Sequence, residues 1–146
     1  MSSWGEFESA DPQFAQRVRA LMCSRKHLTM ATLRRDGSPR ISGTEVEFVD
    51  NEMKIGSMAG AVKAQDLFRD ARVAIHGPTA DPPQDKPDDW SGEAKVAGKA
   101  LAQNSSNDSH TFMIDVKEAV ITSVAGDKLI IESWTPSRGY RKIERS

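Results

Sequence analysis

The sequence predicts a mainly β domain of the α+β class: a small antiparallel barrel of six to seven strands with two or three short helices. Residues 27–35 and 40–48 are strand-like and flank Asp36-Gly37, a dipeptide typical of a tight hairpin turn. Further strand-like segments follow at residues 52–57, 71–77 and 90–103, and two or three more lie within residues 111–134. Helical spacing is confined to two stretches, so strands dominate the predicted single domain over residues 1–146.

The predicted helices lie before and between the strands. Asp11-Pro12 combines an N-cap residue with proline at the first helical position, and it predicts a helix over residues 12–24. A second, shorter helix is predicted over residues 61–70. Residues 1–10 precede both helices and are expected to form a flexible arm. The first helix has its apolar residues on one face, at Phe14, Val18, Leu21 and Met22.

Turns and loops separate the later strands. Residues 78–89 are rich in proline and aspartate and predict a solvated loop, and residues 103–109 predict a second one. Residues 125–127 are expected to turn the last hairpin. Gly92 and Gly98 interrupt the strand predicted at residues 90–103, and such glycines often mark bulges or tight bends.

Composition and charge exclude several classes of protein. The chain has 146 residues, enough for one domain with a hydrophobic core, and 38% of them are hydrophobic. Its 20 basic and 21 acidic side chains leave a net charge of −1, which provides no broad surface for nucleic acid or an anionic membrane. The longest apolar run, residues 20–23, is too short to span a bilayer, and no secretory signal pattern is found. With Cys23 as its single cysteine, the protein is expected to be cytoplasmic.

Common catalytic and metal-binding patterns are missing. His27, His76 and His110 lie far apart, and their spacing matches no zinc site. The chain has no nucleophile elbow, Walker loop or dinucleotide fingerprint. Glu45 and Glu47 share one face of a strand and could act as an acid/base pair, but a solvated strand face is the favoured interpretation. The sequence therefore predicts no catalytic residue and no metal ligand.

One segment carries a pattern suited to phosphate. A strand ends at Ser57, a loop of small residues follows, and the predicted helix has Lys63 in its first turn. A helix N-terminus offers free backbone N–H groups and a partial positive charge, which favour an anion. The macrodipole alone would favour an acidic residue there, so a lysine is better explained by an external anion. The alternative is a lysine that is simply solvated.

The succession of residues 27–48, 51–77 and 92–100 resembles the pyridoxamine 5′-phosphate oxidase-like superfamily. The resemblance covers about half the chain in the correct order, and Ala71 replaces a usual proline. Residues 133–145 are similar to the tryptophan-proline-arginine-glycine tail of several members. The matching positions are Ala31-Thr32-Leu33, Asp36-Gly37-Ser38-Pro39, Ser57, Lys63, Asp66-Leu67 and Arg69-Asp70-Ala71-Arg72-Val73.

This resemblance implies a split β-barrel homodimer that binds FMN or the deazaflavin coenzyme F-420 in clefts between its subunits. It implies that Ser57 and Lys63 hold the cofactor phosphate and that Arg40 reaches the phosphate region. Trp134 and Arg138 would close the cleft from the partner chain, although Trp134 could equally be a core residue at the barrel end. The second-strand residues that would run beside the ring are Ile41, Ser42, Gly43 and Thr44. At Gly43, the alternative to close approach of a ring is a simple bulge.

The predicted function is that of an oxidoreductase that transfers a hydride between the bound flavin or deazaflavin and a small organic substrate. The deazaflavin is slightly favoured by the resemblance to short members with this tail. Vitamin B6 oxidation is not expected, because the Arg-x-His element of true pyridoxamine phosphate oxidases is missing here. The alternatives are a dimer that binds or sequesters the cofactor without catalysis and, third, a haem-handling protein, for which no axial ligand is identifiable.

Overall fold

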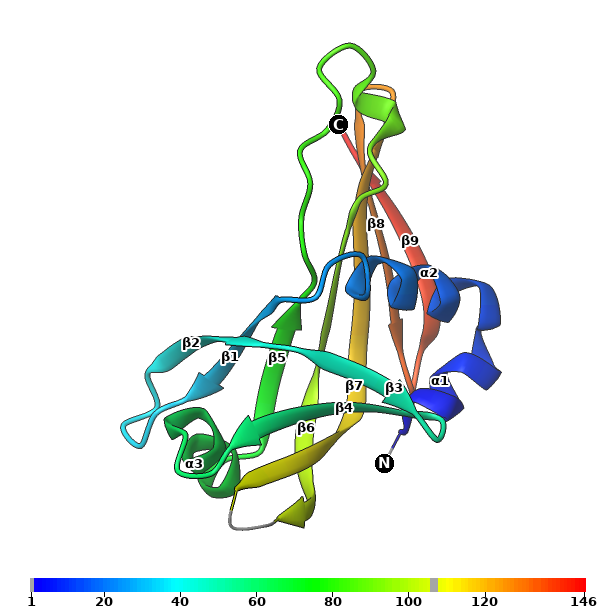
Figure 1. The fold of residues 1–146 in the computed structure, drawn as a ribbon. Coiled ribbons are helices and arrows are strands. Elements are labelled where there is room, and N and C mark those ends of the chain that lie inside the picture. The colour runs from blue at the N-terminus through cyan, green and yellow to red at the C-terminus, as the bar shows by residue number, and fades with distance from the viewer. Residues whose placement is uncertain (1, 106–107) are drawn as a thin grey trace.

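The computed structural model describes residues 2–105 and 108–146, in which the strands form a single antiparallel sheet of nine strands (Figure 1). Seven strands follow the order β2-β1-β5-β6-β7-β4-β3, and β8 and β9 continue from β7. The strands are β1 (Leu28–Leu33), β2 (Pro39–Thr44), β3 (Val46–Val49), β4 (Glu52–Met58), β5 (Arg72–His76), β6 (Glu93–Ser105), β7 (Ser109–Ala125), β8 (Lys128–Thr135) and β9 (Gly139–Arg145). The helices are α1 (Trp4–Ala10), α2 (Pro12–Met22) and α3 (Val62–Arg69), with a short 3₁₀ helix η1 (Pro87–Asp89).

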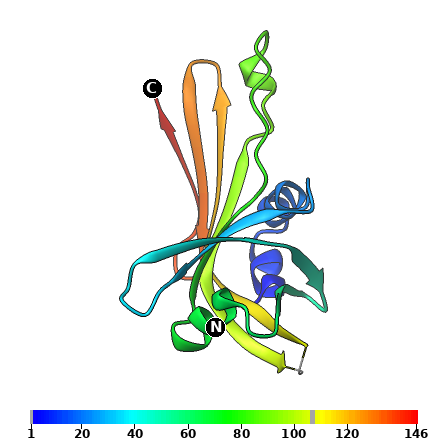
Figure 2. The same ribbon diagram turned by 60° about the vertical axis from the view of Figure 1, so that its left-hand side comes forward.

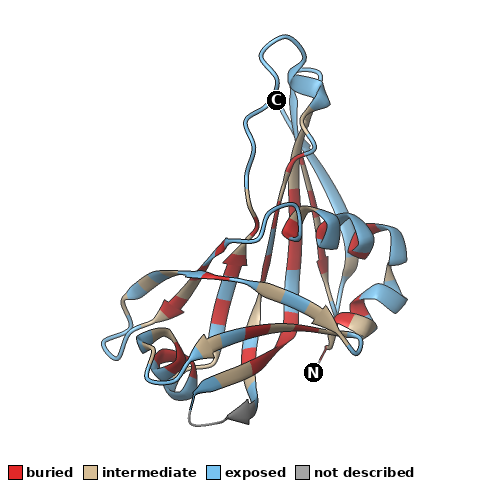
Figure 3. Cartoon of the chain, viewed as in Figure 1, coloured by how far each residue is buried: buried red, intermediate tan, exposed pale blue. Residues whose placement is uncertain are grey.

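The long strand β7 connects the two parts of the sheet. Residues 109–113 pair with β4, residues 119–125 pair with β8, and β6 pairs with β7 along most of its length. Figure 2 shows the β8–β9 hairpin and the loop after β5 extending away from the part that β1 to β4 build. Buried positions follow the inner faces of the strands and helices (Figure 3). The small antiparallel barrel with short helices is therefore confirmed.

The strand boundaries differ from the prediction in four places. Residues 40–48 form two strands, β2 and β3, because the chain breaks at Glu45. Residues 111–116 and 118–124 form one strand, β7, and β9 adds a strand that the sequence did not predict. The predicted loop at residues 103–109 is shorter, since β6 runs to Ser105 and β7 begins at Ser109; residues 106–107 lie outside the described residues.

The bulge predicted at Gly98 is confirmed. The register between β6 and β7 shifts between Ala97 and Gly98. A Cβ atom at Gly98 would overlap the carbonyl oxygen of Asp115, so only glycine fits this close approach of the two strands. The carboxylate of Asp115 is buried and accepts a hydrogen bond of 2.6 Å from the backbone N–H of Ser2. The bulge therefore lies where the N-terminal segment attaches to the sheet.

The expectation of a flexible arm over residues 1–10 is wrong for residues 2–10, and residue 1 lies outside the described residues. These residues include α1, whose N-terminus is capped by Ser3 Oγ accepting 3.2 Å from the backbone N–H of Glu6. Trp4 and Phe7 are fully buried, and the ring of Phe7 stacks on Trp134 with centroids 4.4 Å apart. The gain from removing two large aromatic side chains from water outweighs the cost of ordering so short a segment.

Helix α2 confirms the predicted amphipathic helix, with Asp11 Oδ1 accepting 3.1 Å from the N–H of Phe14 as its N-cap. From its outer side Arg17 donates two hydrogen bonds of 2.7 Å to the buried carboxylate of Glu132 on β8. The hydroxyl of Tyr140 on β9 donates to the same carboxylate at 2.7 Å. Hydrogen bonds from Arg17 outweigh burial and lower the pKa of Glu132 below its usual value. This network ties α2 to the β8–β9 hairpin.

None of the helices in the described part of the chain has the length and the apolar character needed to cross a membrane.

Candidate functional site

A groove with a volume of ≈ 730 Å³ lies between the β2–β3 corner, β4, the start of β7 and the N-terminal end of α3. These elements meet because β3 and β4 form a hairpin, β4 pairs with β7, and α3 follows β4 after a short turn. Four residues predicted from the sequence line this groove: Gly43, Thr44, Ser57 and Lys63. The fold therefore brings together residues from β2, β4 and α3 that the sequence pattern linked to a cofactor.

The α3 end of the groove combines a lysine with the start of a helix. Helix α3 begins after Ala61 with no side-chain cap and has no acidic residue in its first turn. Lys63 Nζ donates 2.9 Å to the carbonyl oxygen of Gly43, and it pairs with no carboxylate in the part of the chain that the structure describes. Ser57 Oγ donates 3.2 Å to the carbonyl of Met58. An ammonium, a hydroxyl and uncapped backbone N–H groups together suit a phosphate.

Gly43 is a regular member of β2. It pairs with Thr29 without a shift in register, so the alternative of a simple bulge is wrong. A Cβ atom at Gly43 would lie 4.0 Å from the nearest neighbour, the carbonyl oxygen of Leu28. The fold therefore has room for a side chain at this position, and the missing side chain leaves the backbone of β2 open toward the groove.

The other predicted residues of β2 do not line the groove. Ile41 is 74% exposed, and Ser42 is half-buried on the opposite face of the strand. Arg40 points toward α3, where its Nε donates 2.7 Å to Asp66. Of the sequence-predicted segment 40–44, the structure thus places only the last two residues in the groove and leaves Arg40 beside it on the strand.

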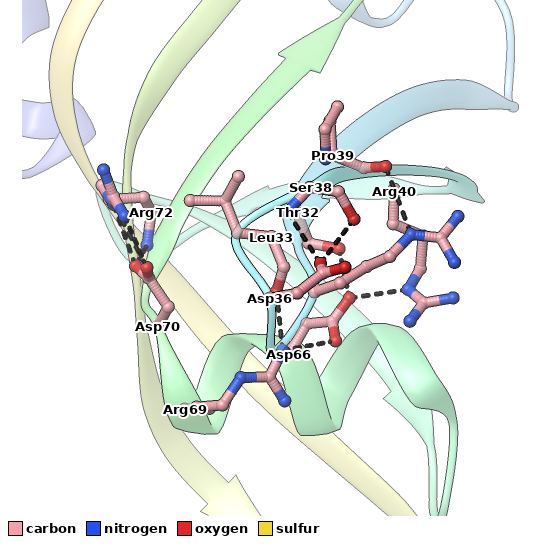
Figure 4. Close-up of polar contacts among 11 residues, drawn as sticks. Thr32, Leu33, Asp36, Ser38, Pro39, Arg40, Asp66, Arg69, Asp70 and Arg72 are labelled. Carbon is pink, nitrogen blue, oxygen red and sulfur yellow. Dashed lines mark hydrogen bonds and ion pairs between the residues drawn. The ribbon is translucent and has the colours of Figure 1, made fainter.

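Asp66 is the centre of a polar cluster next to the groove (Figure 4). Its carboxylate, whose side chain is 2% exposed, also accepts 2.8 Å from Thr32 Oγ1 and 2.9 Å from Arg69 Nη2. Burial alone would raise the pKa of Asp66, but hydrogen bonds from Arg40, Thr32 and Arg69 outweigh it and lower the pKa to about 2. Arg69 Nη2 also donates 2.7 Å to the carbonyl of Leu33. The cluster joins α3 to β1 and β2.

The two residues predicted from the C-terminal tail lie elsewhere. Trp134 is 4% exposed and stacks on Phe7, so its prediction as a residue that closes the cleft is wrong and the alternative, a core residue, is right. Arg138 follows β8, and its Nη2 donates 3.0 Å to Ser133 Oγ. It does not line the groove of its own chain. Its place across a dimer interface stays a prediction.

Sequence reasoning missed a polar wall of the groove. His27, Glu45, Glu47 and Lys54 all line it. Glu45 Oε1 lies 3.3 Å from His27 Nε2, because the break between β2 and β3 turns Glu45 toward the start of β1. Both glutamates are exposed, as the favoured interpretation of a solvated strand face predicted, and only the break at Glu45 could have indicated that they also line a groove. Within residues 2–105 and 108–146 no three potential ligands gather as a metal site.

No family model and no curated protein matches the chain, but solved structures do. PhzG from Burkholderia lata 383, solved with tetrahydrophenazine-1-carboxylic acid, matches with a TM-score of 0.66 and 8% identity over 91% of this chain and 88% of its own. A pyridoxamine 5′-phosphate oxidase-related, FMN-binding protein from Nostoc punctiforme matches with a TM-score of 0.61 and 10% identity over 96% of both chains. A haem-binding protein from Mycobacterium smegmatis matches with a TM-score of 0.52 and 12% identity, over 89% of this chain and 86% of its own.

Identities this low establish a shared architecture and leave the chemistry of this chain open. The matches nevertheless extend over 91% and 96% of the chain, more than the half that the main sequence resemblance covered. The chain therefore shares the fold of these solved proteins, a split β-barrel as that resemblance predicted.

Proposed function

We propose that this protein is a flavin- or deazaflavin-dependent oxidoreductase that acts on a small organic substrate. The observation that carries the proposal is the groove itself: Ser57 and Lys63, which the sequence linked to a phosphate, line it together with the open backbone of Gly43. The fold supports the proposal, because one solved structure that shares it is an FMN-binding protein. FMN and F-420 both carry a phosphate and a flat ring, so both fit this donor set.

Each part of the groove has a separate task in this proposal. Lys63 and Ser57 hold the cofactor phosphate by charge-assisted and hydroxyl hydrogen bonds. Gly43 lets the ring lie close to the backbone of β2, and Met58, which is exposed, also lines the groove. When bound, the cofactor supplies hydride transfer, so the protein needs to bind, orient and exclude water and requires no catalytic dyad.

We further propose that two copies form a dimer with the cofactor between them, as the resemblance implies. Around the groove and α3, three apolar side chains are exposed in the single chain: Met58 at 79%, Val62 at 50% and Phe68 at 52%. A second chain that packs there would remove them from water and would narrow the open groove. Arg138 of one chain would then lie near the groove of the other.

An absorption spectrum of the purified protein, followed by titration with FMN and with reduced F-420, tests this proposal. We expect saturable binding of one of them, oxidation or reduction of the bound cofactor on adding a small acceptor or donor, and a dimer on sedimentation. Saturable binding without turnover of any acceptor would favour the non-catalytic binding dimer. Binding of neither cofactor, together with a Soret band on adding haemin, would contradict the proposal in favour of haem handling.

The substitution Gly43→Val is expected to weaken cofactor binding without lowering the stability of the fold. The added side chain has room in the strand, and valine favours extended backbone, so the free energy of unfolding measured in urea is expected to stay within about 0.5 kcal/mol of wild type. The same side chain would project where the ring approaches β2, so the affinity for the cofactor is expected to fall by about tenfold or more. Ile41→Val, on the same strand outside the groove, is the control and should bind as wild type does. Equal affinities for all three proteins would show that the cofactor ring does not lie against β2 at Gly43.

A further inference from the structure

Asp66 is a buried carboxylate that the proposed function does not yet use. It lies on α3 one turn after Lys63, and its side chain is 2% exposed. Three side chains from three elements donate to it: Thr32 from β1, Arg40 from β2 and Arg69 from α3 itself. A buried carboxylate with two arginine partners holds both in one arrangement, because releasing either arginine leaves its charge poorly compensated.

Helix α3 contacts β2 at two successive points. Lys63 reaches the carbonyl of Gly43, and Asp66 reaches the side chain of Arg40. These partners lie three residues apart on both the helix and the strand, so Lys63 and Arg40 belong to one seam between α3 and β2. The first contact, between Lys63 and Gly43, lies in the groove. The second contact, between Asp66 and Arg40, lies outside the groove and further along β2.

The way in which Asp66 holds Arg40 is specific. The carboxylate takes the Nε–H of Arg40 at 2.7 Å. Among the residues that the structure describes, neither terminal nitrogen of Arg40 has an acceptor. The Arg40 side chain is 25% exposed, so its outer nitrogens remain accessible to a ligand. A guanidinium held at Nε presents its two terminal N–H₂ groups as a fixed fork, which matches the oxygens of a phosphate.

We propose that Asp66 is a positioning residue for the phosphate end of the cofactor site, acting through Arg40. This inference rests on the proposed function and assigns Asp66 a role in that same site. Asp66 fixes the Arg40 guanidinium at the seam, where it adds to Lys63 a second, oriented cation for the phosphate. Because the side chain is already ordered before the ligand arrives, binding loses less conformational entropy.

The alternative is that Asp66 serves only to tie α3 to the sheet. Both roles predict that Asp66→Asn lowers stability, so stability does not separate them. The phosphate does. FMN and riboflavin share the ring and differ only in the phosphate, and the ratio of their dissociation constants reports the phosphate contacts alone. F-420 and its phosphate-free deazaflavin core serve as a second pair, but they also differ in the tail beyond the phosphate, so the ratio for FMN and riboflavin decides.

The experiment compares this ratio in wild type, Asp66→Asn, Arg40→Lys, the double variant and Thr32→Val. Asp66→Asn is expected to lower the preference for FMN about tenfold with riboflavin affinity unchanged. Arg40→Lys keeps the positive charge but carries a single ammonium group. One ammonium cannot both pair with Asp66 and offer two N–H₂ groups to a phosphate, so the preference for FMN over riboflavin should fall by a similar factor. The double variant should be no worse than Arg40→Lys, since Asp66 acts through Arg40. Thr32→Val removes another bond to the same carboxylate oxygen and should keep the wild-type preference.

The outcomes are distinguishable. A wild-type preference for the phosphate form that persists in Asp66→Asn overturns the inference and leaves the proposed function intact. Additive losses in the double variant also overturn it, because Asp66 would then act independently of Arg40. If the wild-type protein binds FMN and F-420 no better than their phosphate-free forms, the proposed phosphate site fails and the inference fails with it. Should Asp66→Asn not fold, a wild-type preference in Arg40→Lys overturns the inference by itself.

Discussion

Phe7→Ala is expected to lower the free energy of unfolding by about 3–5 kcal/mol, the usual cost of removing a buried aromatic side chain. Phe7 is fully buried and packs against Trp4, Phe14 and Trp134, so its loss leaves a cavity that three large rings cannot readily fill. Urea unfolding followed by tryptophan fluorescence measures the change, and Trp4 and Trp134 lie in direct contact with the altered position.

The same substitution at a half-exposed ring provides the control. Phe68 is 52% exposed on α3, so Phe68→Ala is expected to cost about 1 kcal/mol. Equal losses of stability in the two variants would mean that α1 does not pack on the sheet in solution, and residues 1–10 would then have to be regarded as the flexible arm that the sequence predicted.

Lys63→Ala is expected to weaken cofactor binding roughly ten- to hundredfold, because it removes a charge-assisted contact worth about 1.5–3 kcal/mol. Lys63→Glu should bind more weakly still, since it sets a negative charge against the phosphate. The fold should survive both changes. The lysine makes one hydrogen bond to a backbone carbonyl at an exposed site, and alanine is a better helix former.

The matched control for this series is Lys86→Ala. Lys86 is exposed in the loop before η1, far along the chain from the groove, and its removal changes the net charge by the same amount. Titration of all four proteins with the same cofactor gives the comparison. Equal affinities would show that Lys63 is solvated, and the phosphate assignment, which is the main sequence-level support for the oxidoreductase, would be lost.

The parts of the fold that the sequence predicted are those in which local pattern and tertiary packing agree. Helix α2 has its cap, its proline and its apolar stripe in register, and all three are used as expected. Helix α1 was missed because seven residues with two aromatic side chains give no periodicity. Its one local signal was Ser3 followed three residues later by Glu6, the pattern of a capping box.

Strand β9 was missed for a different reason, because its own sequence carries no strand pattern. Its residues after Gly139 are exposed and mostly charged, so no alternation of apolar residues marks it as a strand. It is held by backbone pairing with β8 over seven residue pairs and by Tyr140 reaching Glu132. Backbone pairing of this kind leaves no trace in the sequence of the paired strand, and it depends on a partner that lies in place for other reasons.

The candidate site was predictable where it depends on a local motif and unpredictable where it depends on chain geometry. Ser57 and Lys63 flank one loop, so their proximity followed from the sequence. The position of Glu45 depends on a break between two strands, and that of Trp134 on the packing of α1, neither of which a pattern of residue types reveals. Asp66 was visible as part of a motif, but its partners are separated from it by 26 and 34 positions.

The central place of β7 has a consequence for how the chain reaches this structure. Lys54 pairs with Met113, and Ala94 pairs with Ile121, so neither β4 nor β6 completes its hydrogen bonding until residues 109–125 have been synthesised. Joining β4 to β7 closes a long loop, which is slow because its entropy is lost before distant contacts compensate for it, whereas β6 and β7 are consecutive strands. A nascent chain that stops short of β7 leaves two strand edges unpaired and exposed to aggregation. The synthesis of this one segment therefore decides when β4 and β6 can be joined in one sheet, and β8 and β9 are added after it.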